Sequence, residues 1–249
     1  MIGRLGRELL GGARQLIFPN LCMICEAALP PGQGIACVAC RELVTADPHR
    51  VCTRCTSSIG EFAVVDGSCA HCQGTSLHFD QAFRLGVYGG ILREVILRMK
   101  YGRDEILAAS VGSIWADHCA ERFRMLEPQV VMPVPLHWWR RWRRGYNQAE
   151  PLAVALAERL GLPCDARSLR RIRYTRPQTN QSATARRENM RGAFRSADGV
   201  AIRGRTILLI DDVLTTGSTL SEAARALKGA GAARVVAAVL AHRERDGRA

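Results

Sequence analysis

One ten-residue segment constrains the fold of this chain more than any other feature. Residues 210–219 join two adjacent carboxylates to a glycine loop that is rich in hydroxyl groups. A continuous apolar run at 206–210 precedes the acids, and apolar residues recur at helical spacing after the loop. The pattern predicts a buried strand that ends at the acids and a helix that begins at the loop. Such a unit belongs to an open α/β sheet, whose ligands bind at the carboxyl ends of the strands.

The residue types in this segment indicate a ribose-phosphate ligand. The first turn of a helix offers unpaired N–H groups to a phosphate, and Gly217 allows the backbone to approach an anion closely. Two carboxylates repel a phosphate, so Asp211 and Asp212 suit vicinal hydroxyls or a metal ion that bridges to the ligand. A simple helix cap needs one hydroxyl, whereas this loop supplies four. The hydroxyl residues are Thr215, Thr216, Ser218 and Thr219.

The segment resembles the phosphoribosyl-diphosphate signature of type I phosphoribosyltransferases. In that family the acid pair holds the ribose 2′ and 3′ hydroxyls, and the loop holds the 5′-phosphate. The resemblance implies the first role for Asp211 and Asp212. Purine-salvage members usually carry an acid at the position of Thr215, which argues against ordinary 6-oxopurine salvage here. The resemblance assigns the binding of the 5′-phosphate to Thr215, Thr216, Gly217, Ser218 and Thr219.

Eight of the ten cysteines form four Cys-x-x-Cys pairs, and this spacing is typical of metal sites. The loops between the pairs suit two zinc-ribbon hairpins, each with a structural tetrahedral Zn²⁺ site. Disulfides are the alternative, but a reducing cytosol disfavours them. Sequential pairing of neighbours is simplest, and a crossed arrangement of the first and third pairs stays open. The ligands would be Cys22, Cys25, Cys37, Cys40, Cys52, Cys55, Cys69 and Cys72.

Composition and periodicity divide the chain into three parts. We expect an amphipathic helix at 1–20, a double zinc ribbon at 21–78 and a mostly parallel α/β domain flanked by helices at 79–249. No apolar stretch approaches the ~20 residues that span a bilayer, and no secretory signal is evident, so we expect a cytoplasmic protein. An arginine-rich transit peptide is the alternative. Strands are predicted at 82–88, 130–135, 206–210 and 234–241, and helices at 91–99, 104–123, 146–160 and 218–229.

Positive charge is concentrated in one stretch of the chain. Residues 22–72 hold three arginines and five acids, whereas residues 137–195 hold fourteen arginines and four acids. A codon bias toward arginine would also give such a surplus. The run 137–144 interleaves aromatic rings with cations, a pattern that stacks and neutralises single-stranded nucleic acid. The alternative is a helix start that buries its tryptophans. Candidate nucleic-acid contacts are Trp138, Arg140, Arg141, Trp142, Arg143, Arg186 and Arg187.

Further segments complete a resemblance to the ComF family, which comprises competence-associated proteins with a double zinc ribbon and a phosphoribosyltransferase-like domain. The resemblance covers about residues 15–242 and adds the motifs at 133–137, at 144–148 and at 178–194, in the same order. It implies an arm around 176–191 that closes over the site. Catalytic roles would fall on Asp211, Asp212, Arg144 and Arg176. The pyrophosphate loop would comprise Pro133, Val134, Pro135, Leu136 and His137.

Three functions follow as hypotheses. The first is a phosphoribosyltransferase with an unidentified nitrogen acceptor, in which Mg²⁺ and arginines stabilise the departing pyrophosphate. The second is a catalytically weak module that senses phosphoribosyl diphosphate and binds single-stranded DNA, with competence or DNA-processing proteins as partners. The third is a ligand-responsive regulator that uses its zinc ribbons as a contact surface.

Overall fold

The computed structural model describes residues 20–30, 32–61, 63, 67–174, 183–197 and 202–244. The chain forms two compact units, Met1–Val44 and Thr45–Ala249. Most of the helix expected at 1–20 lies outside the described residues, as does Arg176. The side chains of Arg186 and Arg187 also lie outside them.

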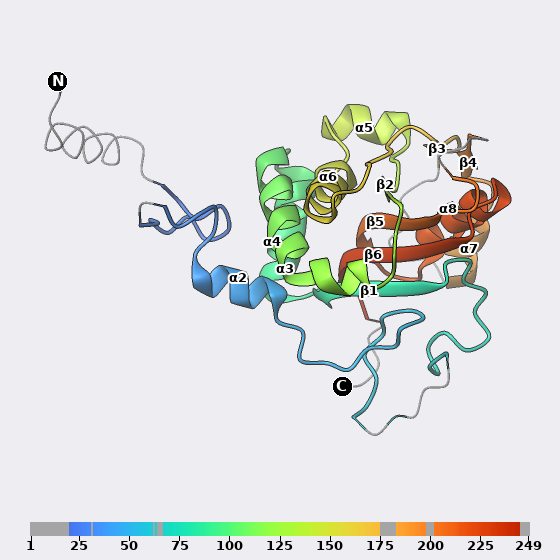
Figure 1. Cartoon of the computed structure of the whole chain (residues 1–249), viewed down its shortest axis with the longest axis horizontal. Helices are drawn as coiled ribbons and strands as arrows, with labels where there is room; N and C mark the ends of the chain where they lie inside the picture. Colours follow the sequence, from blue (N-terminus) through green and yellow to red (C-terminus); the bar gives the residue numbers. More distant parts are fainter. Residues whose placement is uncertain are drawn as a thin grey trace, which may run out of the picture. The chain divides into compact units, whose positions relative to one another are not determined.

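The larger unit is built on a four-stranded sheet with the order β1-β6-β5-β2, in which every neighbouring pair is parallel (Figure 1). All positions of β6 after Arg234 are buried, which is the pattern of a parallel strand covered on both faces. The predicted mostly parallel α/β sheet is therefore confirmed. The strands are β1 (Gln81–Val87), β2 (Val130–Pro133), β5 (Thr206–Leu214) and β6 (Arg234–His242).

Helices cover both faces of this sheet. The connection from β1 to β2 crosses the sheet in one direction, and the connection from β5 to β6 crosses it in the other. Because such crossovers are right-handed, their helices lie on opposite faces. The first face carries α3 (Gly90–Tyr101), α4 (Glu105–Arg124) and α6 (Ala149–Leu160), and the second carries α8 (Ser218–Gly229).

The remaining elements are short, and sequence periodicity did not predict them. A two-stranded antiparallel ribbon pairs β3 (Leu169–Arg171) with β4 (Phe194–Ser196) and packs on α8. Short runs of three residues carry too few positions for a period to show. The helices α2 (Val38–Thr45), α5 (Trp138–Arg144) and α7 (Ala183–Met190) complete the described elements. None of the helices in the described ranges combines the length and apolar character that a bilayer span requires.

The division into two compact units falls within the segment 21–78, which we expect to form the double zinc ribbon. The larger unit begins at Thr45, so the second group of cysteines belongs to it. Those four cysteines are buried in the same apolar core as Leu77 and Phe79. Shared burial with the sheet, which cysteine spacing does not reveal, explains why the second group of cysteines belongs to the larger unit.

Candidate functional site

Both acids of the predicted site lie inside β5, near its carboxyl end. Sequence alone placed the end of this strand at Ile210, whereas pairing with β6 continues to Leu214 opposite His242. Because β6 pairs with β5 beyond the apolar run, the strand continues past the expected end. The neighbouring strand β2 stops at Pro133, which pairs with Ile210. The acids therefore lie at the edge of the sheet where β2 no longer covers β5.

Asp212 is the more enclosed of the two acids, with 4% of its surface exposed. The Nε2 of Gln148 donates a 2.8 Å hydrogen bond to its Oδ2, and the Nζ of Lys100 lies 3.1 Å from the same oxygen. These contacts join β5 to the start of α6 and the end of α3. The carboxylate is thus held in one position by an amide and a cation.

The surroundings of Asp211 disfavour its charged form. Burial raises its pKa to about 7, and the charge of Asp212 acts in the same direction. The backbone N–H of Asp212 donates a 2.9 Å hydrogen bond to its Oδ1, and Lys100 and Arg171 partly oppose the shift. A pKa this far from the ordinary aspartate value is typical of a functional position. Asp211 therefore keeps its proton to a higher pH than an ordinary aspartate, and its carboxyl oxygens can accept hydrogen bonds from a hydroxyl ligand.

The glycine loop follows β5 directly and leads into α8. Gly217 has φ 72°, and an added Cβ would lie 3.3 Å from Leu77, so both the conformation and the space favour glycine. The hydroxyls of Thr216 and Ser218 are 2.7 Å apart. α8 begins at Ser218, so its unpaired N–H groups and these hydroxyls lie together. The arrangement offers several donors to one anion.

The predicted pyrophosphate loop connects β2 to α5. His137 is 6% exposed, and its Nδ1 accepts a 3.4 Å hydrogen bond from the N–H of Trp139. Burial lowers the pKa of His137, and the charges of Arg171 and Arg140 lower it further. Asn147 holds the loop from the other side, because its side-chain amide donates to the Val134 carbonyl at 3.1 Å. The structure thus brings this loop next to two arginines.

Arg144 reaches the acid pair through an intermediate side chain. Its Nη1 donates to the Oε1 of Gln148 at 3.2 Å, and Gln148 in turn donates to Asp212. The guanidinium also lies over the ring of Tyr101, 5.8 Å from its centroid. Arg144 is therefore linked to Asp212 through Gln148 and does not contact the acids directly.

Three residues of this site were absent from the residues proposed from sequence: Lys100, Gln148 and Arg171. Gln148 lies in a motif that supported the family resemblance, and Lys100 is one of only two lysines in the chain. Neither signal specifies a contact with Asp212. Arg171 lies on β3, where burial lowers its pKa to about 10, Arg140 lowers it further and Asp211 opposes the change. These contacts arise from the packing of separate segments, which local patterns do not encode.

The aromatic and basic run forms α5, whose residues are all at least partly exposed. Trp138 and Trp142 are 70% and 78% exposed, so the alternative of a helix that buries its tryptophans is wrong. The guanidinium of Arg143 lies 5.8 Å from the ring centroid of Trp139. Arg141 forms a two-point ion pair with Glu150. α5 thus presents two accessible rings among cations.

The cysteines gather into two groups of four, each made of neighbouring pairs. The sequential arrangement is confirmed, and the crossed one is wrong. Within the groups, Cys25 and Cys37 have sulfurs 3.8 Å apart, and Cys55 and Cys69 have sulfurs 3.6 Å apart. A tetrahedral ion at about 2.3 Å from each sulfur separates the sulfurs by about 3.8 Å, so the geometry fits a zinc-type site.

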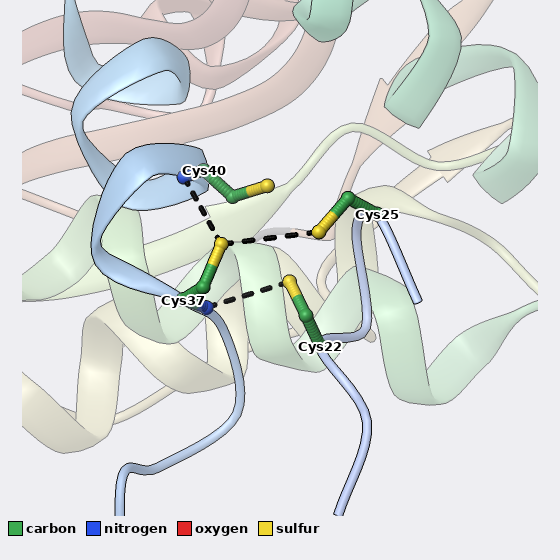
Figure 2. Close-up of side chains that lie close together, drawn as sticks. All are labelled: Cys22, Cys25, Cys37 and Cys40. Atoms are coloured by element: carbon green, nitrogen blue, oxygen red, sulfur yellow. Dashed lines mark hydrogen bonds between the residues drawn. The ribbon is translucent and has the colours of Figure 1, made fainter. Parts of the chain in front are cut away.

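Figure 2 shows the first group with the hydrogen bonds that orient it. The N–H of Cys37 donates to the Cys22 sulfur and the N–H of Cys40 donates to the Cys37 sulfur, both at 3.4 Å. All cysteines in the described ranges are free thiols. Burial raises the pKa of Cys40 and Cys55 above the ordinary thiol value, so a bound cation would be needed to keep them ionised.

Known proteins are similar to this chain both over one domain and over most of its length. Residues 147–249 match the family model described as a phosphoribosyl transferase domain. Competence protein F of Haemophilus influenzae is 32% identical over 216 residues, which cover 84% of this chain and 91% of that protein. DNA utilization protein YhgH of Salmonella typhi is 30% identical over 223 residues, covering 88% of this chain and 96% of that protein.

A more distant relative and a solved structure complete the comparison. Competence protein ComFC of Bacillus subtilis is 26% identical over 244 residues, covering 90% of this chain and 93% of that protein. The glutamine phosphoribosylpyrophosphate amidotransferase of B. subtilis, solved with ADP and GMP, is 23% identical with a TM-score of 0.36. That match covers 56% of this chain and 26% of the amidotransferase.

Proposed function

Because the chain belongs to the competence protein F family, we propose that it binds phosphoribosyl diphosphate through Asp211, Asp212 and the loop at 215–219. One observation carries this proposal. Two adjacent carboxylates, of which Asp212 is buried and held by an amide and a cation, lie on the strand that leads into a hydroxyl-rich helix start. The acids suit the ribose hydroxyls, and the loop suits the 5′-phosphate.

The surrounding side chains would orient the ribose and stabilise the leaving pyrophosphate in a phosphoribosyl transfer. Gln148 and Lys100 hold Asp212 in place, so the ribose is oriented before the reaction. The charges of Arg140 and Arg171 act on the loop at 133–137, where the leaving pyrophosphate would develop negative charge. Mg²⁺, when bound with the diphosphate, would neutralise part of that charge. A neutral His137 can donate a hydrogen bond there without adding another positive charge.

We further propose that both cysteine groups hold structural Zn²⁺. All four protein ligands are present in each group, which leaves no open coordination position for catalysis. Bound zinc would crosslink the ribbon segments and stabilise their fold. Thiolate sites of this kind suit a reducing cytoplasm.

Calorimetric titration of phosphoribosyl diphosphate, with and without Mg²⁺, tests the binding site. We expect the Asp211→Asn/Asp212→Asn double variant to lose at least about 100-fold in affinity, because two hydrogen bonds to charged acceptors are lost at about 1.5–3 kcal/mol each. Asp117→Asn is the matched control, since Asp117 is an exposed residue of α4 that pairs with Arg159. Equal affinity in the double variant and the wild type would rule out the acid pair as the ribose site.

Turnover has a separate test. Release of pyrophosphate from phosphoribosyl diphosphate in the presence of a nitrogen acceptor, lost in the double variant, would establish a phosphoribosyltransferase. Binding without release over a broad panel of nucleobases and amines would instead favour a sensor or a ligand-responsive regulator.

A second candidate function rests on α5. Trp138 and Trp142 are exposed beside several arginines, and stacking on such rings contributes about 1–3 kcal/mol per base. We therefore propose single-stranded DNA binding at this helix. The names of the relatives, Competence protein F and DNA utilization protein, are in keeping with this proposal.

Fluorescence anisotropy with a labelled oligonucleotide tests this candidate. Trp142→Ala should weaken binding by about 5- to 150-fold, which is the range that one stacked base implies. Binding should also weaken steeply as salt is raised. Ile106→Ala is the control, because Ile106 is also a largely exposed apolar residue but carries no ring. Salt-independent binding, or equal losses in both variants, would contradict the proposal.

A further inference from the structure

The helix α5 begins at the loop that is proposed to bind the diphosphate. The last residue of this loop, His137, caps the helix, because its Nδ1 accepts a hydrogen bond from the N–H of Trp139. The carbonyl of His137 also accepts a 3.0 Å hydrogen bond from the N–H of Arg141 in the first turn. The loop at 133–137 and the helix with the exposed tryptophans therefore form one continuous structure.

The far end of α5 is connected to the same site. Arg144, the last residue of the helix, donates to Gln148, and Gln148 donates to Asp212. Between these two residues, the side-chain amide of Asn147 donates to the carbonyl of Val134 in the loop. Both ends of α5 are thus attached to residues that surround the proposed phosphoribosyl-diphosphate site.

Three arginines, here called the arginine line, interact in sequence from α5 toward the acid pair. Burial lowers the pKa of Arg140, and the charge of Arg144 lowers it further. Burial also lowers the pKa of Arg171 to about 10, Arg140 lowers it further and Asp211 opposes the change. Arginines that repel one another in this way are stabilised when an anion binds among them. The arginine line therefore favours a bound anion at either of its ends.

Aromatic rings bring the proposed DNA surface close to the diphosphate loop. The ring of His137 lies 5.5 Å from that of Trp138 and 5.3 Å from that of Tyr174, measured between centroids. Tyr174 in turn lies 5.6 Å from Trp139. Trp138 is 70% exposed, so a base can stack on it. Because every nucleotide carries a phosphate, a strand stacked there places negative charge beside the loop.

We propose that phosphoribosyl diphosphate and single-stranded DNA oppose each other's binding to this protein. This antagonism rests on the proposed function and on the proposed DNA contact at α5, and it adds that the two ligands share Arg140 and Arg171. A diphosphate at 133–137 neutralises these arginines and brings negative charge of its own, so a polyanion on α5 is attracted less strongly. By linkage, DNA weakens the binding of phosphoribosyl diphosphate by the same factor.

The antagonism gives the protein a ligand-controlled grip on DNA. It retains a single strand while phosphoribosyl diphosphate is scarce and releases the strand when that ligand is abundant. Release needs no bond to form or break, so it follows from binding alone, with or without phosphoribosyl transfer.

Fluorescence anisotropy with a labelled thymidine oligonucleotide, on the full-length, metal-loaded chain, tests the inference. The Kd for DNA is measured without ligand, with saturating phosphoribosyl diphosphate and with saturating ribose 5-phosphate, at constant ionic strength and Mg²⁺. Calorimetry on the same samples establishes saturation. Phosphoribosyl diphosphate should raise the Kd at least about 5-fold, the lower end of typical coupling between two sites. Ribose 5-phosphate lacks the diphosphate and should leave the Kd nearly unchanged.

A variant tests whether the arginine line carries the effect. In Arg140→Gln, the ratio of the DNA Kd with phosphoribosyl diphosphate to the Kd without it should be smaller than in the wild type. Arg159→Gln removes an exposed positive charge of α6 that pairs with Asp117, and it should keep the wild-type ratio. Any change in DNA affinity that does not depend on the ligand cancels in this ratio. If Arg140→Gln does not fold, the comparison with ribose 5-phosphate decides alone.

The outcomes separate the antagonism from the proposed function. A DNA Kd that stays constant or falls with phosphoribosyl diphosphate, an equal effect of ribose 5-phosphate, or an unchanged ratio in Arg140→Gln would overturn the antagonism, although calorimetry still detected phosphoribosyl diphosphate. Absence of DNA binding would overturn it together with the second candidate function. A failure of calorimetry to detect phosphoribosyl diphosphate would instead remove the proposed function itself.

Discussion

The two cysteine groups use the same local design in different surroundings. In each, a short bridge flanks the first pair, between Leu21 and Ala28 in one case and between Val51 and Ser58 in the other. In the first group Cys25 is exposed, whereas all four cysteines of the second group are buried. The same Cys-x-x-Cys pairs therefore give one cysteine group that is partly exposed in a small unit and another that is buried in a large core.

Contacts with the sheet account for the difference. Arg54, which lies between the second group's first two cysteines, donates to the backbone carbonyls of Leu77 at 2.5 Å and of Asp80 at 2.8 Å. Arg84 of β1 donates to Ser58 and to the carbonyl of Thr56, each at 2.8 Å. The second group thus has a scaffold of hydrogen bonds and apolar packing in addition to the proposed metal ion. With zinc bound as proposed, the first group would depend far more on its metal ion, because a unit of that size has little core.

The largest expected effect comes from removing one sulfur ligand of the second group, and the matching change in the first group serves as the comparison. Cys55→Ser should destabilise the larger unit by more than about 4 kcal/mol, since metal loss is among the few changes with effects of that size. For a unit of about 200 residues this lowers Tm by about 8–16 °C. Differential scanning calorimetry, with metal content from native mass spectrometry, measures both quantities.

Cys25→Ser provides the comparison. It should remove one metal ion and leave the Tm of the larger unit unchanged, because Cys25 lies in the smaller unit. If both substitutions lowered that Tm equally, the two groups would not differ in the way that their packing indicates.

Arg84→Met tests the scaffold around the second group without touching a sulfur. The Arg84 side chain is fully enclosed and pairs with Asp47 at 2.8 Å and with Glu244 at 2.9 Å. Removing one partner of a buried ion pair costs about 3–5 kcal/mol. Chemical denaturation should show a loss of that size, whereas Arg159→Met, which breaks an exposed pair, should lose no more than about 1 kcal/mol. Similar losses in both variants would mean that Arg84 adds little to the scaffold.

Asp211→Asn should act in the opposite direction and stabilise the unliganded protein. The folded pKa of about 7 lies above the ordinary value of 3.8, so the folded state binds more protons between these values. Stability therefore falls as pH rises from 3.8 to 7, and the full penalty is present above 7. At pH 8 the variant should gain about 0.5–2 kcal/mol, as is common when a functional charge is removed. Thermal melts of both proteins at pH 5 and pH 8 measure the change, and no gain at pH 8 would contradict it.

Glu244→Gln should give the smallest effect. Although burial opposes the shift, hydrogen bonds from Ser58 and Arg84 lower the pKa of Glu244 to about 2. Its stabilising contribution is therefore complete above the ordinary value of 4.5 and disappears as pH falls toward 2. Because the carboxylate is more than a third exposed, we expect a difference under about 1 kcal/mol at pH 7. The difference in Tm between the variant and the wild type should shrink as pH falls; a constant difference would exclude an ionic contribution.

Local pattern was sufficient for the features in which neighbours along the chain act together. The apolar run before Asp211, the helical spacing after Gly217 and the cysteine spacing each predicted an element or a ligand group that the structure contains. These signals are local because a strand, a helix start and a Cys-x-x-Cys turn are defined by a few consecutive residues.

Only the tertiary structure decided which distant residues meet. It placed Lys100 and Gln148 on Asp212, exposed Trp142 and buried the second cysteine group in the sheet's core. The physical reason is that the pairing of separate segments depends on the packing of the whole unit, whereas sequence periodicity records only which face of an element is apolar. The sequence by itself therefore determined the chemistry available to this protein, and the fold determined where that chemistry is assembled.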